Sequence, residues 1–292
     1  MSIPVNVWNS GSRDPVENLS FEECILDEAS ARPPHLILYG NENAVIVGKN
    51  QNPWVECDPP RLETLGIALL RRVSGGGTVF HGPGNLNVGF VVPRRGFERR
   101  RQLEIIADAI RGPGVKPIIT ERGDILCDGY KVSGNAMCFR RERVLHHMTV
   151  LCNADLYALR DSLRPADTSI ETRAIASHRM SVANLTSFDA NLTEEIIRHR
   201  IVSMFNKVYS VGGVGTIGDI DPECIARRTE RHLSWAWRLG RTPRFTSRAA
   251  DGRRISVRDG LVQAIIAEDG LSRPLERPVP FTPGIALSDA TD

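Results

Sequence analysis

Three consecutive glycines stand in the run Arg71-Arg72-Val73-Ser74-Gly75-Gly76-Gly77-Thr78-Val79-Phe80-His81. Glycine in a sheet loses backbone entropy and packs no side chain, so close approach by a ligand is one reason for bare backbone here. Exposed N–H groups of such a loop bind anions, and the Arg72 guanidinium can form paired hydrogen bonds to phosphate. The run therefore predicts a nucleotide phosphate site. The alternative is a tight glycine bulge with solvated arginines, and the run matches neither a Walker loop nor a dinucleotide motif.

A second group of polar residues follows Asp124, in the run Tyr130-Lys131-Val132-Ser133-Gly134-Asn135-Ala136. In a strand, Lys131, Ser133 and Asn135 would point to one face, while Val132 and Ala136 would face the core. A lysine, a hydroxyl and an amide on one face can bind a carboxylate. The alternative is a lysine on a solvated strand edge, and the later pair His146-His147 is more often structural than ligating.

The elements that position these residues follow from hydrophobic periodicity and from turn residues. Residues 35–39 and 44–48 read as a hairpin, and residues 67–73 and 85–92 as strands on either side of the glycine run. Residues 124–151 read as three strands. The glycine stretch 211–216 reads as a domain boundary, followed by two short strands near Gly252 and Gly260 and an irregular tail from Pro274. The expected helices cover residues 20–31, 97–110, 156–163, 192–209 and 222–232.

Length and composition indicate one large domain and a smaller companion, because the chain has 292 residues, 41% of them hydrophobic and 25% charged. We expect domains at residues 1–212 and 218–292. The formal net charge of +2 falls short of the basic field that nucleic-acid binding uses. No stretch approaches the roughly 20 apolar residues of a membrane helix. The expectation is a cytoplasmic protein that binds neither nucleic acid nor membrane.

The cysteines are widely spaced and form no C-x-x-C pair, so the sequence suggests neither a zinc site nor a disulfide framework. We expect small buried or half-buried thiols. The six positions are Cys24, Cys57, Cys127, Cys138, Cys152 and Cys224.

Taken together, the motifs resemble those of the lipoate-protein ligases, in the biotin and lipoate ligase superfamily. They occur in order between residues 48 and 185, and the segment from Trp235 to Phe245 resembles the start of that family's small C-terminal domain. Besides the glycine run, the matching motifs are Gly48-Lys-Asn-Gln-Asn-Pro-Trp54, Gly84-Asn85, Lys131-Val-Ser-Gly-Asn-Ala136, Leu145-His-His-Met-Thr149 and Ser181-Val-Ala-Asn-Leu185.

The resemblance implies an α/β (α+β) catalytic domain of mixed sheets flanked by helices, with a small C-terminal α/β accessory domain. It implies that ATP and lipoate react to lipoyl-AMP and that the lipoyl group passes to a lysine of an acceptor protein. Lys131 would be catalytic and contact both substrates, and Asp124 would help to hold Mg²⁺. The remaining ATP-binding residues would be Arg72, Gly77, Thr78, Val79 and Phe80. The remaining lipoate-binding residues would be Ser74, Gly75, Gly76, His81, His146, Gly134 and Ala136, with walls from Val73, Val79 and Val144.

The chain departs from the family pattern at three places. Gly123 stands where asparagine is usual, Gly82-Pro83 replaces an aspartate-containing turn, and Tyr130 replaces a residue that is often basic. The expected partner is a small acidic lipoyl domain, a glycine-cleavage carrier protein or another lipoate-binding carrier.

Two other functions compete with the ligase. One is an ATP-independent lipoyl or octanoyl transferase of the same superfamily, for which Cys127 or Cys138 would have to be reactive. The other is a non-catalytic lipoate- or nucleotide-binding relative.

Overall fold

The computed structural model describes residues 5–28, 34–166, 169–210 and 212–287. Its packing divides the chain into two compact units, each assembled from three stretches of sequence. Unit 1 comprises Met1–Ala44, His81–Ala158 and Arg179–Glu230, and unit 2 comprises Val45–Phe80, Leu159–His178 and Arg231–Asp292. The packing units differ from the predicted domains, because residues 45–80 are grouped with the C-terminal residues. Folding domains at residues 1–212 and 218–292 stay a prediction.

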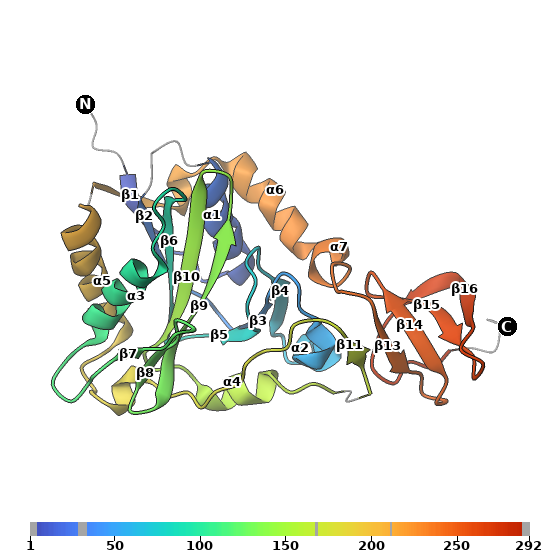
Figure 1. The fold of residues 1–292 in the computed structure, drawn as a ribbon. Helices are drawn as coiled ribbons and strands as arrows, with labels where there is room; N and C mark the ends of the chain where they lie inside the picture. The colour runs from blue at the N-terminus through green and yellow to red at the C-terminus, as the bar shows by residue number, and fades with distance from the viewer. Residues whose placement is uncertain (1–4, 29–33, 167–168, 211, 288–292) are drawn as a thin grey trace. The chain divides into compact units, whose positions relative to one another are not determined.

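An eight-stranded mixed sheet forms unit 1, in the order β12-β1-β2-β6-β10-β9-β8-β7 (Figure 1). The long central strands pair antiparallel, whereas β12, β1 and β2 run parallel at one edge. The strands are β1 (Val5–Asn9), β2 (His35–Gly40), β6 (Asn85–Pro93), β7 (Ile118–Ile119), β8 (Ile125–Cys127), β9 (Tyr130–Phe139), β10 (Arg143–Leu151) and β12 (Gly213–Thr216).

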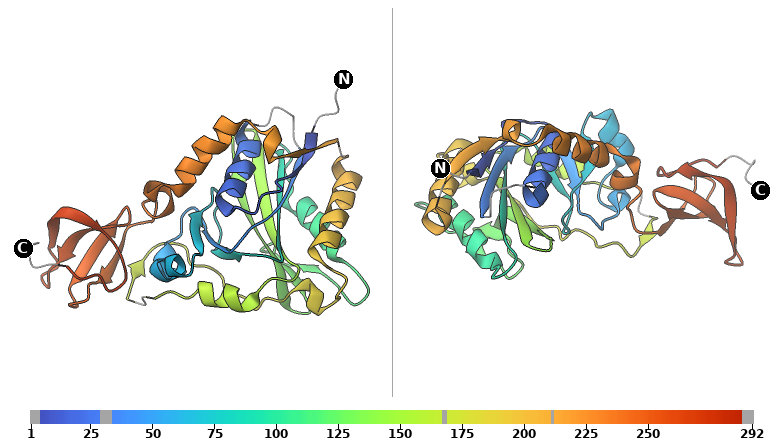
Figure 2. Two further views of the ribbon diagram at one scale, coloured as in Figure 1. Left: turned by 180° about the vertical axis from the view of Figure 1, so that it is seen from behind. Right: turned by 90° about the horizontal axis from the view of Figure 1, so that it is seen from above.

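Helices cover both faces of this sheet (Figures 1 and 2). Helices α3 (Arg99–Ile110) and α5 (Glu194–Tyr209) pack on the face that carries Val88 and Phe90 of β6, and this layer forms the main hydrophobic core. Helix α1 (Pro15–Glu28) packs on the other face of the sheet, where it contacts β6 and β10. Its Glu22 hydrogen-bonds His147 of β10. The predicted alternation along β6 is confirmed, although β6 is buried on both faces up to Val92.

Two smaller sheets belong to unit 2. In the first, β3 (Ala44–Val47) lies between β4 (Ala68–Arg71) and β5 (Val79–His81), so the glycine run connects two strands that share a neighbour. The second sheet packs around Trp54, Phe245 and Phe281. Its strands are β11 (Glu171–Thr172), β13 (Phe245–Arg248), β14 (Arg254–Arg258), β15 (Leu261–Ile266) and β16 (Ser272–Pro280). The remaining elements are η1 (Pro53–Val55), α2 (Pro59–Thr64), α4 (Leu156–Ser162), η2 (Leu185–Ser187), η3 (Ile217–Asp219), α6 (Pro222–Leu233) and α7 (Trp235–Arg238).

Two expectations about the strands were wrong. β2 and β3 do not form a hairpin, because β2 pairs with β1 and β6 while β3 joins the small sheet of unit 2. The glycine stretch at the predicted domain boundary contains Gly213–Thr216, which is strand β12 of the main sheet. The tail from Pro274 is largely the regular strand β16, which accommodates its prolines at the edge of its sheet.

Helix starts also differ from those expected. Helix α1 begins at Pro15 rather than Ser20, because the Asp14 side chain accepts hydrogen bonds from the backbone N–H groups of Val16 and Glu17. The expected end of this helix at Ala31 lies outside the described residues. Helix α5 is capped by Thr193, whose hydroxyl accepts from the backbone N–H of Ile196.

The cysteines contradict the sequence-based expectation in part. Cys24 of α1 and Cys224 of α6 form a disulfide across 200 residues of sequence. Cys57, Cys127, Cys138 and Cys152 are buried free thiols, as expected. Within the described ranges, no helix is long and apolar enough to cross a membrane.

Candidate active site

Each of the three glycines in the loop between β4 and β5 lies in a different environment. A Cβ on Gly75 would contact nothing within 4 Å, so the bare backbone there faces open space. Gly76 has φ +82°, which glycine adopts at little cost, and its carbonyl lies 2.2 Å from where a Cβ of Gly48 would stand. A Cβ on Gly77 would approach the Ser177 hydroxyl to 2.9 Å. Close contact with the Gly76 backbone therefore explains Gly48, and close contact with the Ser177 side chain explains Gly77, whereas Gly75 is the position open to a ligand.

Arg72 is buried and shapes this loop. Its guanidinium donates to the carbonyls of Gly75 and Gly77 at 2.5 and 2.7 Å, and to the Ser74 hydroxyl at 2.9 Å. A fourth bond reaches the carbonyl of Ile46 on β3 at 3.0 Å. The loop is thus wrapped around a fixed positive charge, which favours anion binding at its exposed N–H groups.

A buried amide supports the other side of the loop. The Gln51 carbonyl oxygen accepts from the Thr78 hydroxyl at 2.8 Å and from the Gly48 N–H at 2.9 Å, while its amide donates to Glu56 and Ser177. The Ser177 hydroxyl in turn accepts from the Thr78 N–H at 2.8 Å. Ser177 lies outside the sequence motifs and was not predicted. Gln51 lies in the Gly48–Trp54 motif, but its sequence context gave no role for it.

Arg71, next to Arg72, is fully buried and connects three segments of unit 2. Its guanidinium donates to the carbonyls of Gly48, Lys49 and Gln51, to the carbonyls of Trp237 and Arg238, and to the Thr242 hydroxyl. The Trp237 indole N–H returns a bond of 2.7 Å to the Arg71 carbonyl. Burial, followed by the charge of Arg241, lowers the pKa of Arg71 to about 10, so it stays charged at neutral pH. Arg71 therefore anchors the α7 segment to the strand that leads into the glycine loop.

In unit 1, Lys131 forms an ion pair with Asp124, with 2.7 Å between Nζ and Oδ1. The Lys131 side chain is 25% exposed and lies over Gly134, where a Cβ would approach Nζ to 2.9 Å. Its backbone is fixed by pairing with Ser181 and Ala183. The predicted sharing of one face by Lys131 and Asn135 is wrong, because Asn135 instead bonds His146 on the other side of the sheet.

Strand register sorts the other predicted residues onto the two faces, because directly paired residues point the same way. Gly134 pairs with Thr149 and Ala136 with His147, and His147 also pairs with Gly89 of β6. These residues form the face beneath α1, which we call the α1 face. It is the face on which the Lys131 ammonium lies.

His146 and Val144 lie on the opposite face, in contrast to their predicted place beside Gly134 and Ala136. Val144 belongs to the core under α3 and α5, and His146 packs edge-on against Phe97, with 6.0 Å between ring centroids. Burial, with smaller contributions from His147 and Arg99, lowers the pKa of His146 to about 3. It is therefore a neutral core residue, displaced from the predicted site by the two-residue period of the strand.

Three polar side chains, those of Glu22, Tyr39 and His147, meet on the α1 face. None of them has a role predicted from the sequence. Glu22 accepts from the Tyr39 hydroxyl at 3.4 Å and lies 2.8 Å from Nδ1 of His147. Glu22 is buried, and its Oε1 lies 3.0 Å from where a Cβ of Gly89 would stand. The signal in the sequence was polar residues inside otherwise apolar runs, with Glu22 in a predicted helix and Tyr39 in a predicted strand.

Buried amides complete this face. Asn87 pairs with Thr149 and Tyr39, and its amide nitrogen has no hydrogen-bond partner in the described structure. Asn85 donates to Asn87 and leaves its own carbonyl oxygen without a partner. A buried unpaired donor is costly, so these amides suit a polar ligand. His81 lies at the end of β5, bonded to the Asn41 side chain at 2.9 Å.

The departure at Gly123 has a local cause. Gly123 has φ +87°, and a Cβ there would approach the Asn135 side-chain nitrogen to 2.8 Å. Asn135 thus supplies an amide beside the position where the family carries one. Among the described residues, no three His, Cys, Asp or Glu side chains gather into a metal site.

The glycine-loop residues from Arg72 to Phe80 belong to unit 2, whereas Lys131, Asp124, Gly134, Ala136, His81 and His146 belong to unit 1.

Comparison with known proteins identifies the class of this fold and site. Residues 14–206 match the family model described as lipoyl protein ligase A/B catalytic domain. The chain is 31% identical over 251 residues to lipoate-protein ligase A of Psychrobacter cryohalolentis, covering 83% of this chain and 74% of that protein. It is 35% identical over 248 residues to the mitochondrial lipoyl amidotransferase LIPT1 of Mus musculus, covering 82% of this chain and 66% of the mouse protein.

Solved structures show the same fold. LipL1 of P. falciparum in complex with lipoate superimposes with a TM-score of 0.68 at 23% identity, covering 89% of this chain and 83% of that one. A lipoate-protein ligase A bound with ATP gives 0.65 at 23% identity, covering 82% and 99%. The chain belongs to the lipoyl protein ligase A/B family.

Proposed function

We propose that the chain is an ATP-dependent lipoate-protein ligase, which converts lipoate and ATP to lipoyl-AMP and then transfers the lipoyl group to an acceptor lysine. The observation that carries the proposal is Lys131, whose ammonium is held by Asp124 over Gly134 on the α1 face. A carboxylate that attacks an α-phosphate brings two anions together. A fixed ammonium between them offsets their repulsion and stabilises the charge that develops in the transition state.

The glycine loop suits the nucleotide part of this reaction. Arg72 fixes a positive charge beneath the loop, and Gly75 leaves backbone open to a ligand. Gly77, Thr78, Val79 and Phe80 continue the loop into β5. We assign these residues to ATP, and Ser74, Gly75 and Gly76 to lipoate.

Asp124, together with phosphate oxygens, would hold Mg²⁺. One or two carboxylates plus substrate phosphates are the usual ligands of such an ion. When bound, it would neutralise the pyrophosphate leaving group.

We assign the α1 face to the lipoate chain, because Gly134, Ala136 and Gly89 carry small or no side chains there and Lys131 and Glu22 lie over the two glycines. On this face His147 takes the place that sequence analysis gave to His146. The pair formed by Glu22 and His147 would then bound the acyl site. His81, bonded to Asn41, stays assigned to the same ligand.

Replacing His147 with alanine is expected to raise the KM for lipoate by about 10-fold, because a buried pair beside the acyl chain is broken. His146→Ala, the matched control one residue earlier, should lower thermal stability and leave the KM for lipoate within about twofold, because its ring packs in the core. Steady-state kinetics at saturating ATP and a melting curve of each variant separate the two effects. A KM change in the His146 variant alone would contradict this assignment.

The ATP-independent transferase is the main rival, since the mouse relative is named a lipoyl amidotransferase. In its octanoyl form that chemistry needs a reactive thiol. Burial and the charge of Asp128 raise the pKa of Cys127 to about 11, so this thiol is a poor nucleophile at neutral pH. This counts against a transfer mechanism that uses the Cys127 thiol, and the experiment below separates the ligase from a lipoyl transferase that needs no thiol.

Pyrophosphate release from ATP by the purified chain tests the proposal. The ligase is expected to release pyrophosphate only when lipoate is added. Transfer to an acceptor from supplied lipoyl-AMP, without lipoate-dependent pyrophosphate release, would identify a transferase and contradict the ligase. Binding of lipoate without either reaction would identify a non-catalytic relative.

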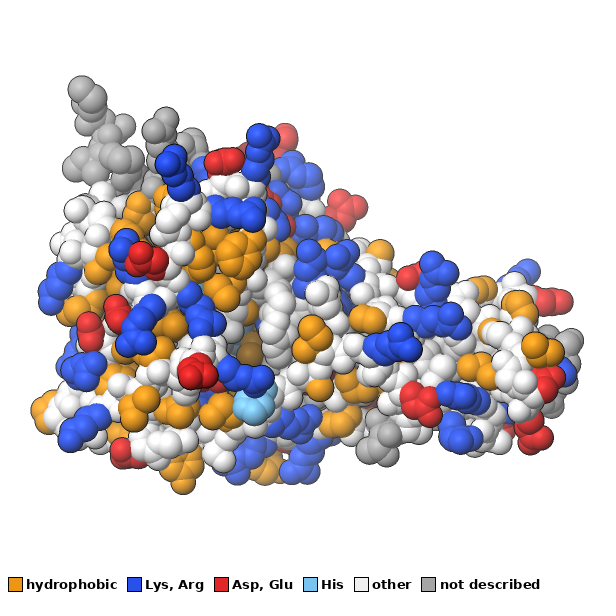
Figure 3. Space-filling view, in the orientation of Figure 1, with side chains coloured by type: hydrophobic (Ala, Val, Ile, Leu, Met, Phe, Trp, Pro, Cys, Tyr) orange, Lys and Arg blue, Asp and Glu red, His pale blue; other side chains and the backbone are white. Residues whose placement is uncertain are grey.

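The acceptor is proposed to be a small acidic carrier, either a lipoyl domain or a protein like the glycine-cleavage carrier. Basic side chains are more prominent than acidic ones on the face drawn in Figure 3. Opposite charge on the acceptor would speed encounter. The transfer rate is then expected to fall as ionic strength rises, and a rate independent of salt would count against an acidic partner.

A further inference from the structure

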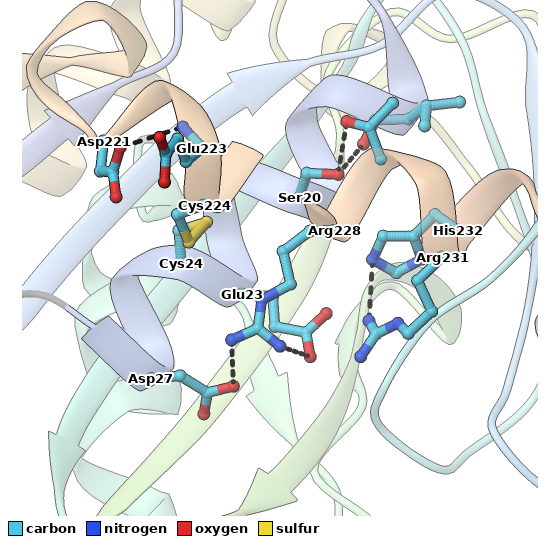
Figure 4. Close-up of a disulfide and its surroundings, with 12 residues drawn as sticks. Ser20, Glu23, Cys24, Asp27, Asp221, Glu223, Cys224, Arg228, Arg231 and His232 are labelled. Carbon is cyan, nitrogen blue, oxygen red and sulfur yellow. Dashed lines mark hydrogen bonds and ion pairs between the residues drawn. A yellow bond between two sulfur atoms is a disulfide. The ribbon is translucent and has the colours of Figure 1, made fainter. Parts of the chain in front are cut away.

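The disulfide between Cys24 and Cys224 joins helix α1 to helix α6 (Figure 4). Both cysteines are about 1% exposed. The proposed ligase chemistry uses neither of them. What the bond does must therefore be sought in the two helices that it connects.

Polar contacts hold the same two helices together independently of the disulfide. Arg228 of α6 lies between two carboxylates of α1, at 3.4 Å from Glu23 and 3.2 Å from Asp27 (Figure 4). One turn earlier in α1, the hydroxyl of Ser20 lies 3.1 Å from that of Thr229, the residue next to Arg228 in α6. These contacts would keep two thiols close together after reduction, so the bond could form again without refolding.

The interface also contains a carboxylate that cannot easily leave it. Glu23 is about 1% exposed, and it is neutralised by Arg228 together with Arg140 from the turn between β9 and β10. A buried charge loses much stability when its partners are removed. Opening the disulfide should thus loosen α6 without detaching it.

Helix α6 leads from the disulfide to the segment that holds Arg71. Its first two turns carry Cys224 and Arg228, its last residues include Arg231, and α7 follows directly. The Arg231 guanidinium lies 4.4 Å from the centre of the Trp237 ring, and Trp237 exchanges hydrogen bonds with Arg71. The disulfide therefore fixes the start of a helix whose continuation anchors the residue beside Arg72.

We propose that Cys24 and Cys224 form a reversible thiol–disulfide switch, opened by a dithiol reductant, that controls how firmly helix α6 is held on α1. One thiolate of the dithiol attacks a sulfur of the pair and forms a mixed disulfide. Its second thiol then displaces that sulfur. The two cysteines end as thiols, having gained two electrons and two protons, and the reductant ends as a disulfide.

Three of the four cysteines outside the disulfide are buried and are poor nucleophiles for this exchange. Burial raises the pKa of Cys57, and it raises the pKa of Cys152 to about 12. With the pKa of Cys127 also raised, these three thiols carry little of the thiolate that attacks disulfides.

The consequence for activity rests on the proposed function. In the oxidised state α6 is fixed and Trp237 holds Arg71, which supports the glycine loop. In the reduced state this support is softer, so the nucleotide should bind more weakly. The switch would regulate adenylate formation by the redox state of its surroundings.

Hydrogen exchange on the full-length protein, with and without reduced dithiothreitol, tests the switch directly. Reduction is expected to speed amide exchange in Pro222–Leu233 by about 10-fold or more and to leave β6 and β10 unchanged, because only the α1–α6 interface opens. Alkylation followed by mass spectrometry should label Cys24 and Cys224 after reduction of the folded protein. Oxidised dithiothreitol should restore both the bond and the slow exchange.

Variants supply the controls. Cys24→Ser and Cys224→Ser are each expected to show fast exchange in α6 without reductant and no further response to it. Cys152→Ser changes a buried cysteine of the same unit that lies outside the disulfide, and its exchange in α6 should respond to reductant as in the parent protein. Free Cys24 and Cys224 in the oxidised folded protein, reduction only after unfolding, or unchanged exchange in α6 would each overturn the proposal.

Activity adds a second measurement. The KM for ATP in lipoate-dependent pyrophosphate release is expected to rise about threefold or more on reduction, and not to respond in the Cys224→Ser variant. A KM that is unchanged in the parent protein would overturn the regulatory part. A protein that releases no pyrophosphate in either state, but shows the exchange response, would refute the ligase and support the switch.

Discussion

Replacing Lys131 with alanine is expected to lower lipoate-dependent pyrophosphate release by about 10³-fold, because the reaction loses the ammonium that stabilises charge between carboxylate and α-phosphate. The fold should persist, since the Lys131 side chain is partly exposed and contributes a charge and no core packing. Pyrophosphate release under saturating ATP and lipoate measures the loss, and circular dichroism measures the fold.

Lys116→Ala is the matched control, because Lys116 is an exposed lysine of the same unit. It should leave pyrophosphate release within about twofold, as surface substitutions away from a site usually do. Near-normal release by the Lys131 variant would remove Lys131 from the chemistry. Loss of release in the control as well would point to a general effect of charge.

Replacing Arg71 with methionine is expected to lower the free energy of unfolding by about 3–5 kcal/mol, since removal of a buried charge leaves its partners unsatisfied. Those partners include the carbonyls of Gly48 and Gln51 in one segment of unit 2 and that of Trp237 in another. Chemical denaturation followed by tryptophan fluorescence measures the change. Arg71→Lys should lose much of the same stability, because an ammonium cannot span the planar arrangement of acceptors.

Arg258→Met provides the comparison, because Arg258 is an arginine of the same unit that lies 73% exposed beside Asp259. It should change the free energy of unfolding by no more than about 0.5 kcal/mol. If Arg71→Met also cost under about 1 kcal/mol, Arg71 would not be the anchor that its hydrogen bonds describe.

The sequence predicted local structure better than strand pairing. The strand containing Lys131, the strand containing His146 and the turn between them were expected from alternation and from turn residues, and they are confirmed as β9 and β10. The hairpin between β2 and β3 was not, because each apolar run is consistent with several partners. Which strands pair is decided by how each run packs against residues that are distant in the sequence. A short stretch of sequence does not contain that information.

The same limitation affected the candidate site. Lys131 and the glycine loop stand out by residue type, but the assignment of His146 required knowing which face of β10 points toward α1. A shift by one residue exchanges the two faces, so the proposed contact with lipoate moves from His146 to His147. The bond between Cys24 and Cys224 was missed for a related reason, since cysteines 200 residues apart give no spacing signal.

The position of β12 bears on how the protein can be shortened. β12 lies at the edge of the main sheet and pairs with β1, so a truncation at residue 212 would strip the hydrogen bonds from one side of the N-terminal strand. The shortened chain would present an open strand edge, which recruits other chains and promotes aggregation. It would also lose Cys224 and Arg228, leaving Cys24 as an unpaired thiol and removing one counter-charge of Glu23. A chain cut before α6 is therefore expected to aggregate more than the full chain, in which β12 covers this side of β1.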